Sequence, residues 1–456
     1  MSAPATTERR TTSSTWVAPV VWALVCTAAY ALLSLLRFRR LEPTSWDNAI
    51  FEQAVRGYAA LDGPVVDIKG PGFNLLGDHF SPVLVLLAPV YRVAPSAQTI
   101  LVAQAVLIGV SVLVVTRLAL RHAGPWAGGA LAGCYGLSFG IASAVRADFH
   151  EVAFAMPLLA LAGAAYVGRR WTAVVGWSLP LLLVKEDLGA TVLMVGVVLW
   201  LAGERRRGLL LAAAGVVGAA LVLLVIVRAI NPGGVYDYAS SVGGERGVLA
   251  TLLDEPGRKA WTVVLTVAVT GLAALASPWV LLVLPTFGWR FLGDNDFYWG
   301  TDWHYSLLLM PIVFVAAVDA MRREPRLRWA AVPAVAVTAA LLPTTALADL
   351  ADPATYTLSD RHEAAEAVLD AIPADASVVT DIGLITHLTT DRTVYWLGTV
   401  GSAPLPDGEP DHVLLDHWAG VGSPPDAVAY AEETFGGAWQ TVVEEDGYQL
   451  ARRVGG

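Results

Sequence analysis

Carboxylates flank the first long interval between apolar runs of the sequence. Asp47 and Glu52 follow the first apolar run, and Asp78 with His79 precede the second. Moving an ionised Asp into hydrocarbon costs roughly 2.5 to 3.5 kcal/mol on membrane-insertion scales. Acids at the ends of apolar runs therefore predict a polar chamber at the rim of a bilayer, where a carboxylate can serve as a general base.

A second cluster combines three residue types within four positions. Asp148, His150 and Glu151 lie where one apolar run ends and the next begins. Oxygen and imidazole groups at this spacing can hold a divalent ion or orient a phosphate. An interfacial ion pair with Arg146 explains the same residues, so the sequence leaves both interpretations open.

Lys185, Glu186 and Asp187 lie between two apolar runs, 171–184 and 188–201, of only 14 residues each. Because such short runs hold the charged trio near the membrane, these side chains are expected to pair or to serve a function. A last polar group, before the tenth apolar run, consists of Asp294, Asp296, Asp302, His304 and Tyr305, and Arg290 lies at the end of the preceding run.

Helix capping is the main alternative role for the first cluster. Asp47 would be an N-cap if residues 47–55 form an interfacial helix. Asp78 and His79 would cap a helix that opens at the Ser-Pro pair of residues 81–82. Spacing alone does not separate capping from catalysis at these positions.

The composition places all of these clusters in a membrane protein. Hydrophobic residues make up 55% of the 456 residues and charged residues 15%, and the mean hydropathy is +0.56. These values are far outside the range of soluble domains. Cys26 and Cys134 both fall inside apolar runs, where a cysteine acts as a small hydrophobic residue. Nothing therefore indicates a disulfide framework or redox chemistry.

The expected fold is an all-α membrane domain followed by a soluble α/β domain. Residues 1–15 form an N-terminal tail, 16–348 the membrane domain and 349–456 the C-terminal domain. About eleven apolar runs are candidate transmembrane helices, since about 20 residues cross ~30 Å of hydrocarbon. These runs are 16–36, 97–120, 125–144, 152–167, 171–184, 188–201, 208–230, 261–275, 278–291, 306–320 and 329–348.

Basic loops predict the orientation. In the eleven-span arrangement most Arg-rich loops fall on the side of the N-terminal tail, which the positive-inside rule makes cytoplasmic. They contain Arg9, Arg10, Arg117, Arg121, Arg169, Arg170, Arg205, Arg206, Arg207, Arg322, Arg323, Arg326 and Arg328. Arg37, Arg39 and Arg40 depart from the rule. The acidic clusters then face the outside of the cytoplasmic membrane, as does the C-terminal domain.

The C-terminal domain is acidic and has its own secondary-structure pattern. Residues 349–456 carry 19 Asp and Glu against 4 Arg, a balance of −15. Such a surface argues against nucleic acid and anionic lipid as its partners. Helices at 360–371, toward 388 and at 425–435 alternate with strands at 377–380, 393–396 and 412–415 and a closing pair around 440–450. No Gly-rich phosphate-binding turn occurs, so acceptor binding is preferred to catalysis for this domain.

Several motifs taken together resemble one family. They are W-D-N-A-I-F-E-Q at 46–53, D-H-F-S-P at 78–82, D-F-H-E at 148–151, V-K-E-D-L at 184–188, W-H-Y-S-L-L-L-M-P at 303–311 and I-P-A-D-A-S-V-V-T at 372–380. The sequence resembles the DUF2079 family of bacterial polytopic membrane proteins, which is grouped with the GT-C superfamily of glycosyltransferases. The resemblance covers nearly the whole chain and implies a GT-C-like architecture.

The wider superfamily implies roles for particular acids. Its members resemble one another in an acidic residue of the first outer loop that acts as base or metal ligand, and in a second acidic motif in the next outer loop. Asp47 matches the first position and Asp148 the second. This sequence departs from an acidic pair because Asn48 follows Asp47, which leaves the base open among Asp47, Glu52 and Asp78.

The resemblance also implies a reaction, the inverting transfer of a sugar from a polyprenyl-phosphate donor to a glycan, lipid or protein acceptor of the cell envelope. Nucleotide sugars are kept in the cytoplasm, away from outward-facing acids, which favours a donor that arrives through the membrane. A transporter or lipid flippase and a non-enzymatic envelope assembly factor are the alternatives. Charged residues here stop at one rim, whereas a transport path would continue them through the spans.

The candidate site residues follow from these clusters. Catalysis is assigned to Asp47, Asp78 and Asp148, and substrate binding to Glu52, Gln53, His79, His150, Glu151, Lys185, Glu186, Asp187, Arg290, His304 and Tyr305. Lys185, Arg290 or His304 would offset charge on the departing phosphate. A divalent cation, Mg or Mn, is an additional expectation that the reaction does not require, and its ligands would be Asp78, His79, Asp148 and His150.

Overall fold

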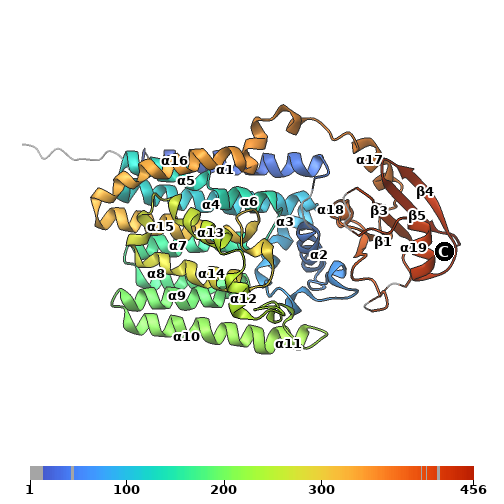
Figure 1. Cartoon of the computed structure of the whole chain (residues 1–456), viewed down its shortest axis with the longest axis horizontal. Helices are drawn as coiled ribbons and strands as arrows, with labels where there is room; N and C mark the ends of the chain where they lie inside the picture. The colour runs from blue at the N-terminus through green and yellow to red at the C-terminus, as the bar shows by residue number, and fades with distance from the viewer. Residues whose placement is uncertain (1–13, 43–45, 402, 407, 419–421, 456) are drawn as a thin grey trace, which may run out of the picture.

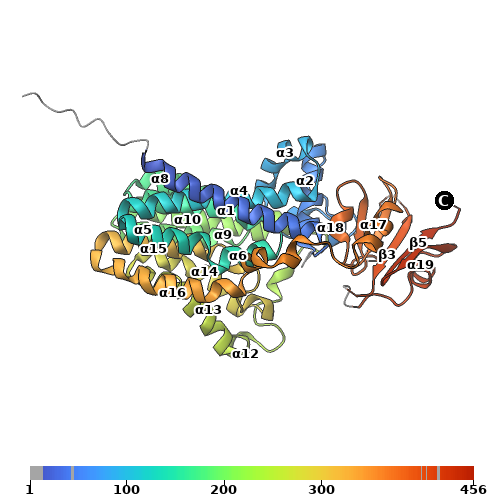
Figure 2. The same cartoon turned by 90° about the horizontal axis from the view of Figure 1, so that it is seen from above.

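The structure is a computed structural model that describes residues 14–42, 46–401, 403–406, 408–418 and 422–455. A bundle of helices forms the larger part, and a small α/β domain lies at one end of it (Figure 1). The bundle and the α/β domain follow one another along the longest axis of the molecule (Figure 2). The α/β domain therefore extends the bundle and does not cover its side.

Six helical stretches of the described residues are long and apolar enough to cross a membrane. They are Trp16–Arg39, Ala97–Ala123, Pro125–Arg146, Arg205–Ile230, His304–Arg323 and Pro325–Thr344. Their helices are α1 (Ser14–Arg39), α4 (Ala97–Ala123), α5 (Pro125–Gly136), α6 (Phe139–Arg146), α10 (Arg205–Leu221), α11 (Val227–Ile230), α15 (Leu309–Arg323) and α16 (Ala331–Leu341). The sequence predicted a span at each position, and its mostly helical membrane domain is confirmed.

Among the residues that the structure describes, five further apolar helical segments have only 10–17 residues. At 1.5 Å per residue such segments fall short of the ~30 Å hydrocarbon core. They are Pro82–Val93, Glu151–Val167, Trp171–Leu183, Leu188–Leu201 and Pro278–Leu292. Their α-helical parts are α3 (Ala88–Val93), α7 (Ala155–Val167), α8 (Trp171–Ser178), α9 (Leu188–Leu201) and α14 (Leu284–Leu292).

The span expected at 261–275 is not one helix. α13 (Pro256–Ala268) ends just before Gly271 and Leu272, whose φ angles are 60° and 66°, and a short 3-10 turn follows. Left-handed backbone cannot continue a right-handed helix. The structure thus shows six candidate spans where the sequence predicted eleven, because the other apolar runs are short or interrupted.

Glycines allow α9 and α10 to pack closely. Gly189 and Gly196 of α9 face Gly215 and Gly208 of α10. A Cβ atom added to Gly196 would lie 2.5 Å from the backbone nitrogen of Ala212. Small residues at a helix contact are typical of membrane helices, because they let the two backbones approach each other.

Gly196→Leu should therefore force α9 and α10 apart and destabilise the protein by about 1–3 kcal/mol, the usual cost of overpacking. The melting temperature of the purified protein in detergent measures this effect. Gly129→Leu is the matched control, because an added Cβ there meets no atom within 4 Å. Equal melting temperatures for the two variants would contradict the close packing.

Basic residues meet at one end of the bundle. The Arg117 guanidinium of α4 lies 3.7 Å from the centre of the Trp16 ring, and Arg328 Nη2 donates to the His122 carbonyl at 3.5 Å. Both contacts lie at the end of the bundle where α1 starts, so basic residues from different turns meet there. The α/β domain lies at the other end (Figure 1).

The α/β domain contains a five-stranded mixed sheet in the order β2-β1-β3-β5-β4. β1 pairs in parallel with β2 and β3, whereas β5 pairs antiparallel with β3 and β4. The strands are β1 (Ser377–Thr380), β2 (Thr393–Trp396), β3 (His412–Asp416), β4 (Trp439–Glu445) and β5 (Tyr448–Arg453), and the helices are α17 (His362–Asp370), α18 (Ile385–Leu388) and α19 (Ala427–Phe435). Every element that the sequence predicted between 360 and 450 is confirmed to within a few residues.

α2 (Asp47–Ala60) joins the α/β domain to the bundle. Gln53 Nε2 donates to the Val394 carbonyl of β2 at 2.9 Å, and the Trp46 ring packs edge-on against the Trp396 ring with centroids 4.3 Å apart. The first residue of α2 therefore lies at the junction between the two parts of the molecule.

The remaining short helix, α12 (Val248–Leu253), lies in the loop region after α11.

Candidate active site

Asp47 and His150 form the centre of the candidate site. His150 Nε2 lies 3.3 Å from Asp47 Oδ2, and the His150 ring stacks on the His304 ring with centroids 3.5 Å apart. The Asp47 side chain is 30% exposed, whereas that of His150 is 3% exposed. A ligand can therefore reach the carboxylate, while its imidazole partner is fixed inside the protein.

A buried amide on a membrane helix positions the loop that carries His150. Gln104 of α4 donates from Nε2 to the Asp148 carbonyl at 2.8 Å and accepts from the His150 N–H at 2.9 Å. Asp148 is mostly buried and has a φ of 66°, a left-handed conformation that Asp adopts more readily than most residues. These two hydrogen bonds hold the strained turn that directs His150 toward Asp47.

Lys185 and Glu151 form an ion pair beside this centre. Lys185 Nζ lies 2.8 Å from Glu151 Oε1, and the Glu151 side chain is fully buried. Glu151 follows His150 directly and opens the short 3-10 helix Glu151–Phe154. Because the pair is withdrawn from water, loss of one partner would leave the other charge without compensation.

Asp78, His79 and Glu186 form a second network next to the Lys185 pair. Lys69 Nζ lies 2.6 Å from Asp78 Oδ2, and His79 Nδ1 lies 3.4 Å from Glu186 Oε1. The Phe80 N–H also donates to Glu186 at 3.2 Å. The loop before α3 is thus tied to the charged segment between α8 and α9.

Charges within this network set its protonation. Burial raises the pKa of Glu186, but the hydrogen bond and charge of His79 and the charge of Lys185 lower it to about 2 overall. Burial lowers the pKa of His79, but the charge of Asp78 and the contact with Glu186 raise it overall above its ordinary 6.5. The network therefore favours an ionised Glu186 beside a protonated His79.

Two tyrosines of the loop after α11 complete the network. The Tyr236 hydroxyl donates to Glu186 Oε1 at 3.1 Å, and the Tyr238 hydroxyl lies 3.1 Å from His79 Nε2. The Tyr238 and His79 rings are stacked with centroids 5.2 Å apart. Through these contacts the loop after α11 packs against the network.

A narrow cavity lies between the two parts of the site. Its lining consists of Val152, Lys185, Asp187, Leu188, Thr286, Trp289, His304, Tyr305 and Leu308. Its volume of ≈ 20 Å³ holds about one water molecule. Asp187 Oδ1, Trp289 Nε1 and His304 Nδ1 are buried and have no hydrogen-bond partner in the described part of the chain. Buried polar atoms of this kind are usually satisfied by water or by a ligand.

Comparison with protein families identifies the chain. The family described as predicted membrane protein (DUF2079) matches residues 37–450. The chain belongs to the DUF2079 family. The match covers every site residue described above and confirms the resemblance carried by the sequence motifs, though it does not reach the GT-C superfamily. Together with the six long apolar helices, it describes a predicted multi-pass membrane protein. A search of curated proteins found no match.

In this DUF2079 chain Arg290 holds a loop. Its guanidinium is fully buried and donates to the Tyr298 carbonyl at 2.7 Å, to the Gly300 carbonyl at 2.5 Å and to Ser306 Oγ at 3.3 Å. These bonds fix the segment that carries His304 and Tyr305. Most donors of Arg290 are therefore engaged by the protein, which leaves Lys185 as the cation that lines the cavity.

The structure does not show the helix caps that the sequence allowed for Asp47, Asp78 and His79. The N-cap residue of α2 is Trp46, and Asp47 is the first helical residue. Ser81 occupies the N-cap of the 3-10 helix Pro82–Leu87 without a side-chain cap, while Asp78 pairs with Lys69.

Ten of the predicted site residues meet at this end of the bundle: Asp47, Asp78, His79, His150, Glu151, Lys185, Glu186, Asp187, His304 and Tyr305. Sequence reasoning did not assign Lys69, Gln104, Tyr236 or Tyr238 to the site. A glutamine in the interior of an apolar run is a signal that could have found Gln104. A weaker signal for Tyr236 and Tyr238 is their position in the Gly- and Pro-containing segment 231–238.

The four expected cation ligands are divided between two networks. Asp78 lies beside His79, which contacts Glu186, whereas Asp148 and His150 lie in the turn held by Gln104. Within the described ranges no group of three or more His, Cys, Asp or Glu side chains is arranged to hold a metal ion. The Mg or Mn expectation stays a prediction.

Glu52 and Gln53 lie in the contact with the α/β domain and do not line the cavity. The fully buried Glu52 carboxylate accepts hydrogen bonds from the Tyr91 hydroxyl at 2.8 Å, from Thr390 Oγ1 at 2.7 Å and from Thr389 Oγ1. Three hydroxyl donors thus compensate a carboxylate that connects α2 to the segment after α18.

Glu52 should make this contact dependent on pH. Burial raises the pKa of Glu52 above its ordinary 4.5, although the three hydroxyls and Arg56 act against the shift. Because the folded-state pKa is the higher one, the stabilisation is complete below pH 4.5 and is lost as the pH rises through the raised pKa.

Glu52→Gln should remove this contribution, so its melting temperature should fall less steeply than that of the native protein as the pH rises above 4.5. Glu433→Gln, on the exposed face of α19, should keep the native slope. Identical slopes for the native protein and Glu52→Gln would show that Glu52 does not titrate in this range.

Proposed function

We propose that this chain is an inverting membrane glycosyltransferase of the GT-C type, which transfers a sugar from a polyprenyl-phosphate donor to an envelope glycan, lipid or protein. The observation that supports it most is the partly exposed Asp47 carboxylate held against His150, next to a cavity lined by Lys185 and His304. A direct displacement needs a base on one side of the reacting carbon and groups that receive a phosphate on the other.

Asp47 is better placed as the base than the other acids, of which Glu52 is fully buried against hydroxyls of the α/β domain. The Asp78 side chain is 1% exposed and already paired with Lys69 at 2.6 Å, and Asp148 is mostly buried. In the proposed step Asp47 takes the proton of the acceptor hydroxyl, and the hydroxyl oxygen forms a bond to the anomeric carbon of the sugar. The bond from that carbon to the phosphate oxygen breaks, and its electron pair leaves with the phosphate.

Lys185 is the cation that would receive the phosphate in this proposal, because it lines the cavity together with Trp289 and His304. Its charge is shared with Glu151, and Glu186 and Asp187 adjoin it in the chain. This excess of acids is the reason to keep a divalent cation, Mg or Mn, in the proposal. The cavity is too small for a sugar phosphate, so donor binding needs an opening of the surrounding loops, as is common in enzymes with lids.

The proposal places the site and the α/β domain at the outer face of the cytoplasmic membrane, with the N-terminus in the cytoplasm. The separation of basic turns from the acidic end of the bundle supports this orientation through the positive-inside rule. In this proposal the short apolar helices and the six long ones together form about eleven membrane segments.

A cysteine introduced at Glu433, which is exposed on α19, should react with a membrane-impermeant maleimide in intact cells. Cys26 and Cys134 are buried, so the parent protein should stay unlabelled and serves as the control. Labelling of Glu433→Cys only after lysis would reverse the orientation and place the site in the cytoplasm.

The function is tested by incubating the purified protein, in lipid nanodiscs, with a radiolabelled polyprenyl-phosphate sugar and an envelope extract as acceptor. We expect transfer of the label and release of polyprenyl phosphate. Transfer from a nucleotide sugar without polyprenyl lipid would contradict the donor. Movement of the intact lipid across the bilayer would indicate a flippase, and stable binding of an envelope protein without turnover would indicate an assembly factor.

A further inference from the structure

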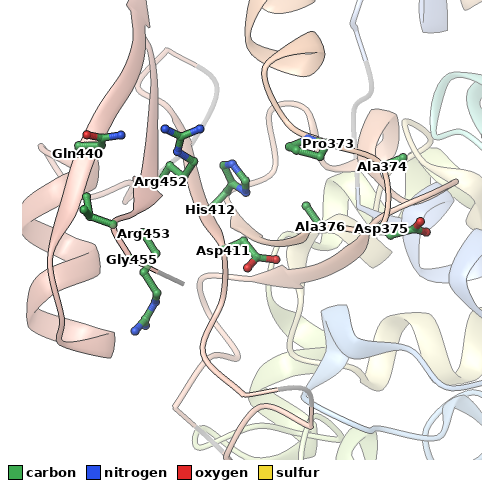
Figure 3. A pocket seen from close by; sticks show the side chains of 11 residues that line it. Pro373, Ala374, Asp375, Ala376, Asp411, His412, Gln440, Arg452, Arg453 and Gly455 are labelled. Atoms are coloured by element: carbon green, nitrogen blue, oxygen red, sulfur yellow. The ribbon is translucent and has the colours of Figure 1, made fainter.

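A hollow on the α/β domain lies apart from the Asp47 site. Its volume is ≈ 550 Å³, within the range of small-ligand pockets, roughly 300–1,000 Å³. β1 and β3 begin at this hollow and β5 ends there (Figure 3). The Asp47 junction adjoins the opposite edge of the sheet, because Trp396, the last residue of β2, contacts Trp46.

His412 is the feature of the hollow that points to a ligand. It is the first residue of β3, it is 3% exposed, and neither ring nitrogen has a hydrogen-bond partner among the residues that the structure describes. Burial lowers the pKa of this imidazole, so at neutral pH one ring nitrogen is a donor and the other an acceptor. A buried polar group that lacks protein partners is rare in folded proteins. A ligand group that both donates and accepts would satisfy it.

Arg452 and Asp411 add complementary groups on either side of His412 (Figure 3). The Arg452 side chain is exposed and makes no ion pair or side-chain hydrogen bond with the residues that the structure describes. Asp411 Oδ2 accepts from the N–H and the hydroxyl of Ser377, both at 2.8 Å, so Oδ1 can still accept from a ligand. The two arginines of the lining are balanced by two aspartates, so the hollow has no net charge that would select an anion.

We propose that this hollow binds a neutral carbohydrate. Each sugar hydroxyl both donates and accepts a hydrogen bond, which matches an imidazole, a carboxylate and a guanidinium placed side by side. Apolar residues of the wall, Pro373, Ala376 and Val454, can face the C–H groups of the sugar ring. The site does not depend on the proposed transfer reaction, since binding requires neither a donor lipid nor turnover.

Binding is tested with the full-length protein in a detergent that has no sugar head group. Saturation-transfer NMR with millimolar lactose, cellobiose and N,N′-diacetylchitobiose should give a signal for at least one of the three. Glucuronate and inorganic phosphate are the anionic comparison, and neither should compete. If no disaccharide binds, or if only the two anions bind, the proposal is wrong.

Variants locate the binding. His412→Leu should weaken it by about tenfold or more and leave the melting temperature unchanged or higher, because an apolar side chain replaces an unpartnered polar one. Arg452→Gln should weaken it without affecting the fold, and Glu433→Gln on α19 should change nothing. Native affinity in His412→Leu would overturn the assignment. Asp47→Asn should bind the disaccharide as the native protein does, so a failure of this proposal and a failure of the proposed transfer reaction can be told apart.

Discussion

Asp47→Asn is expected to lower the rate of sugar transfer by about 10²-fold or more, the usual scale for loss of a general base. The Asp47 carboxylate is reachable from outside and is held 3.3 Å from His150. Asparagine keeps the size of the side chain but cannot take the proton of the acceptor hydroxyl. Because Asp47 is only partly buried at the start of α2, its replacement should cost little stability.

The rate is measured as release of labelled sugar from the polyprenyl-phosphate donor by protein in nanodiscs. Asp62→Asn is the matched control, since Asp62 is an exposed aspartate just beyond the end of the same helix. A native rate in Asp47→Asn would move the role of base to Asp78. A loss of folded protein in place of a loss of rate would make Asp47 a structural residue.

Lys185→Met should be the most destabilising single change at the site. The substitution leaves Glu151 fully buried without its partner at 2.8 Å, and breaking a buried pair in this way costs roughly 3–5 kcal/mol. Adding Glu151→Gln removes the uncompensated charge and should restore most of the stability. Thermal unfolding in detergent measures both variants.

Arg246→Gln is the control for loss of an exposed ion pair. Arg246 contacts Asp254 and Asp294 at the surface, where such pairs contribute about 1 kcal/mol or less. A Lys185→Met protein that melts like Arg246→Gln would contradict the buried pair.

The double variant also separates the two roles assigned to Lys185. With the fold restored, binding of the polyprenyl-phosphate sugar should still be lost, because the cation of the cavity is absent. Lys185→Arg should recover part of the binding, since guanidinium keeps the charge but presents its donors in a different geometry. Native donor binding in the double variant would mean that Lys185 serves only to neutralise Glu151.

Local patterns were enough to predict the class of the protein and the elements of its α/β domain. The strands Ser377–Thr380 and Thr393–Trp396 lie where the sequence predicted them. Short runs rich in β-branched and aromatic residues between turn-forming residues carry that information locally. The long apolar helices were predictable for the same reason, because their length and composition are properties of one segment.

Span counting failed where backbone conformation mattered more than hydropathy. The run 261–275 is apolar enough for a helix, yet Gly271 and Leu272 take left-handed angles and end it. Hydropathy reports how a segment partitions between water and hydrocarbon, and it does not report where neighbouring helices make the chain turn.

Within the site, the sequence by itself determined which residue types collect at one end of the bundle, because polar residues at the ends of apolar runs must lie at a membrane rim. Tertiary structure decided their partners. Glu52 resembled Asp47 in the sequence, but it is buried against hydroxyls of the α/β domain, whereas Asp47 stays partly exposed beside His150. Whether a carboxylate is free to react depends on which distant segment removes it from water and what that segment donates to it. That choice arises only when segments far apart in the chain pack together.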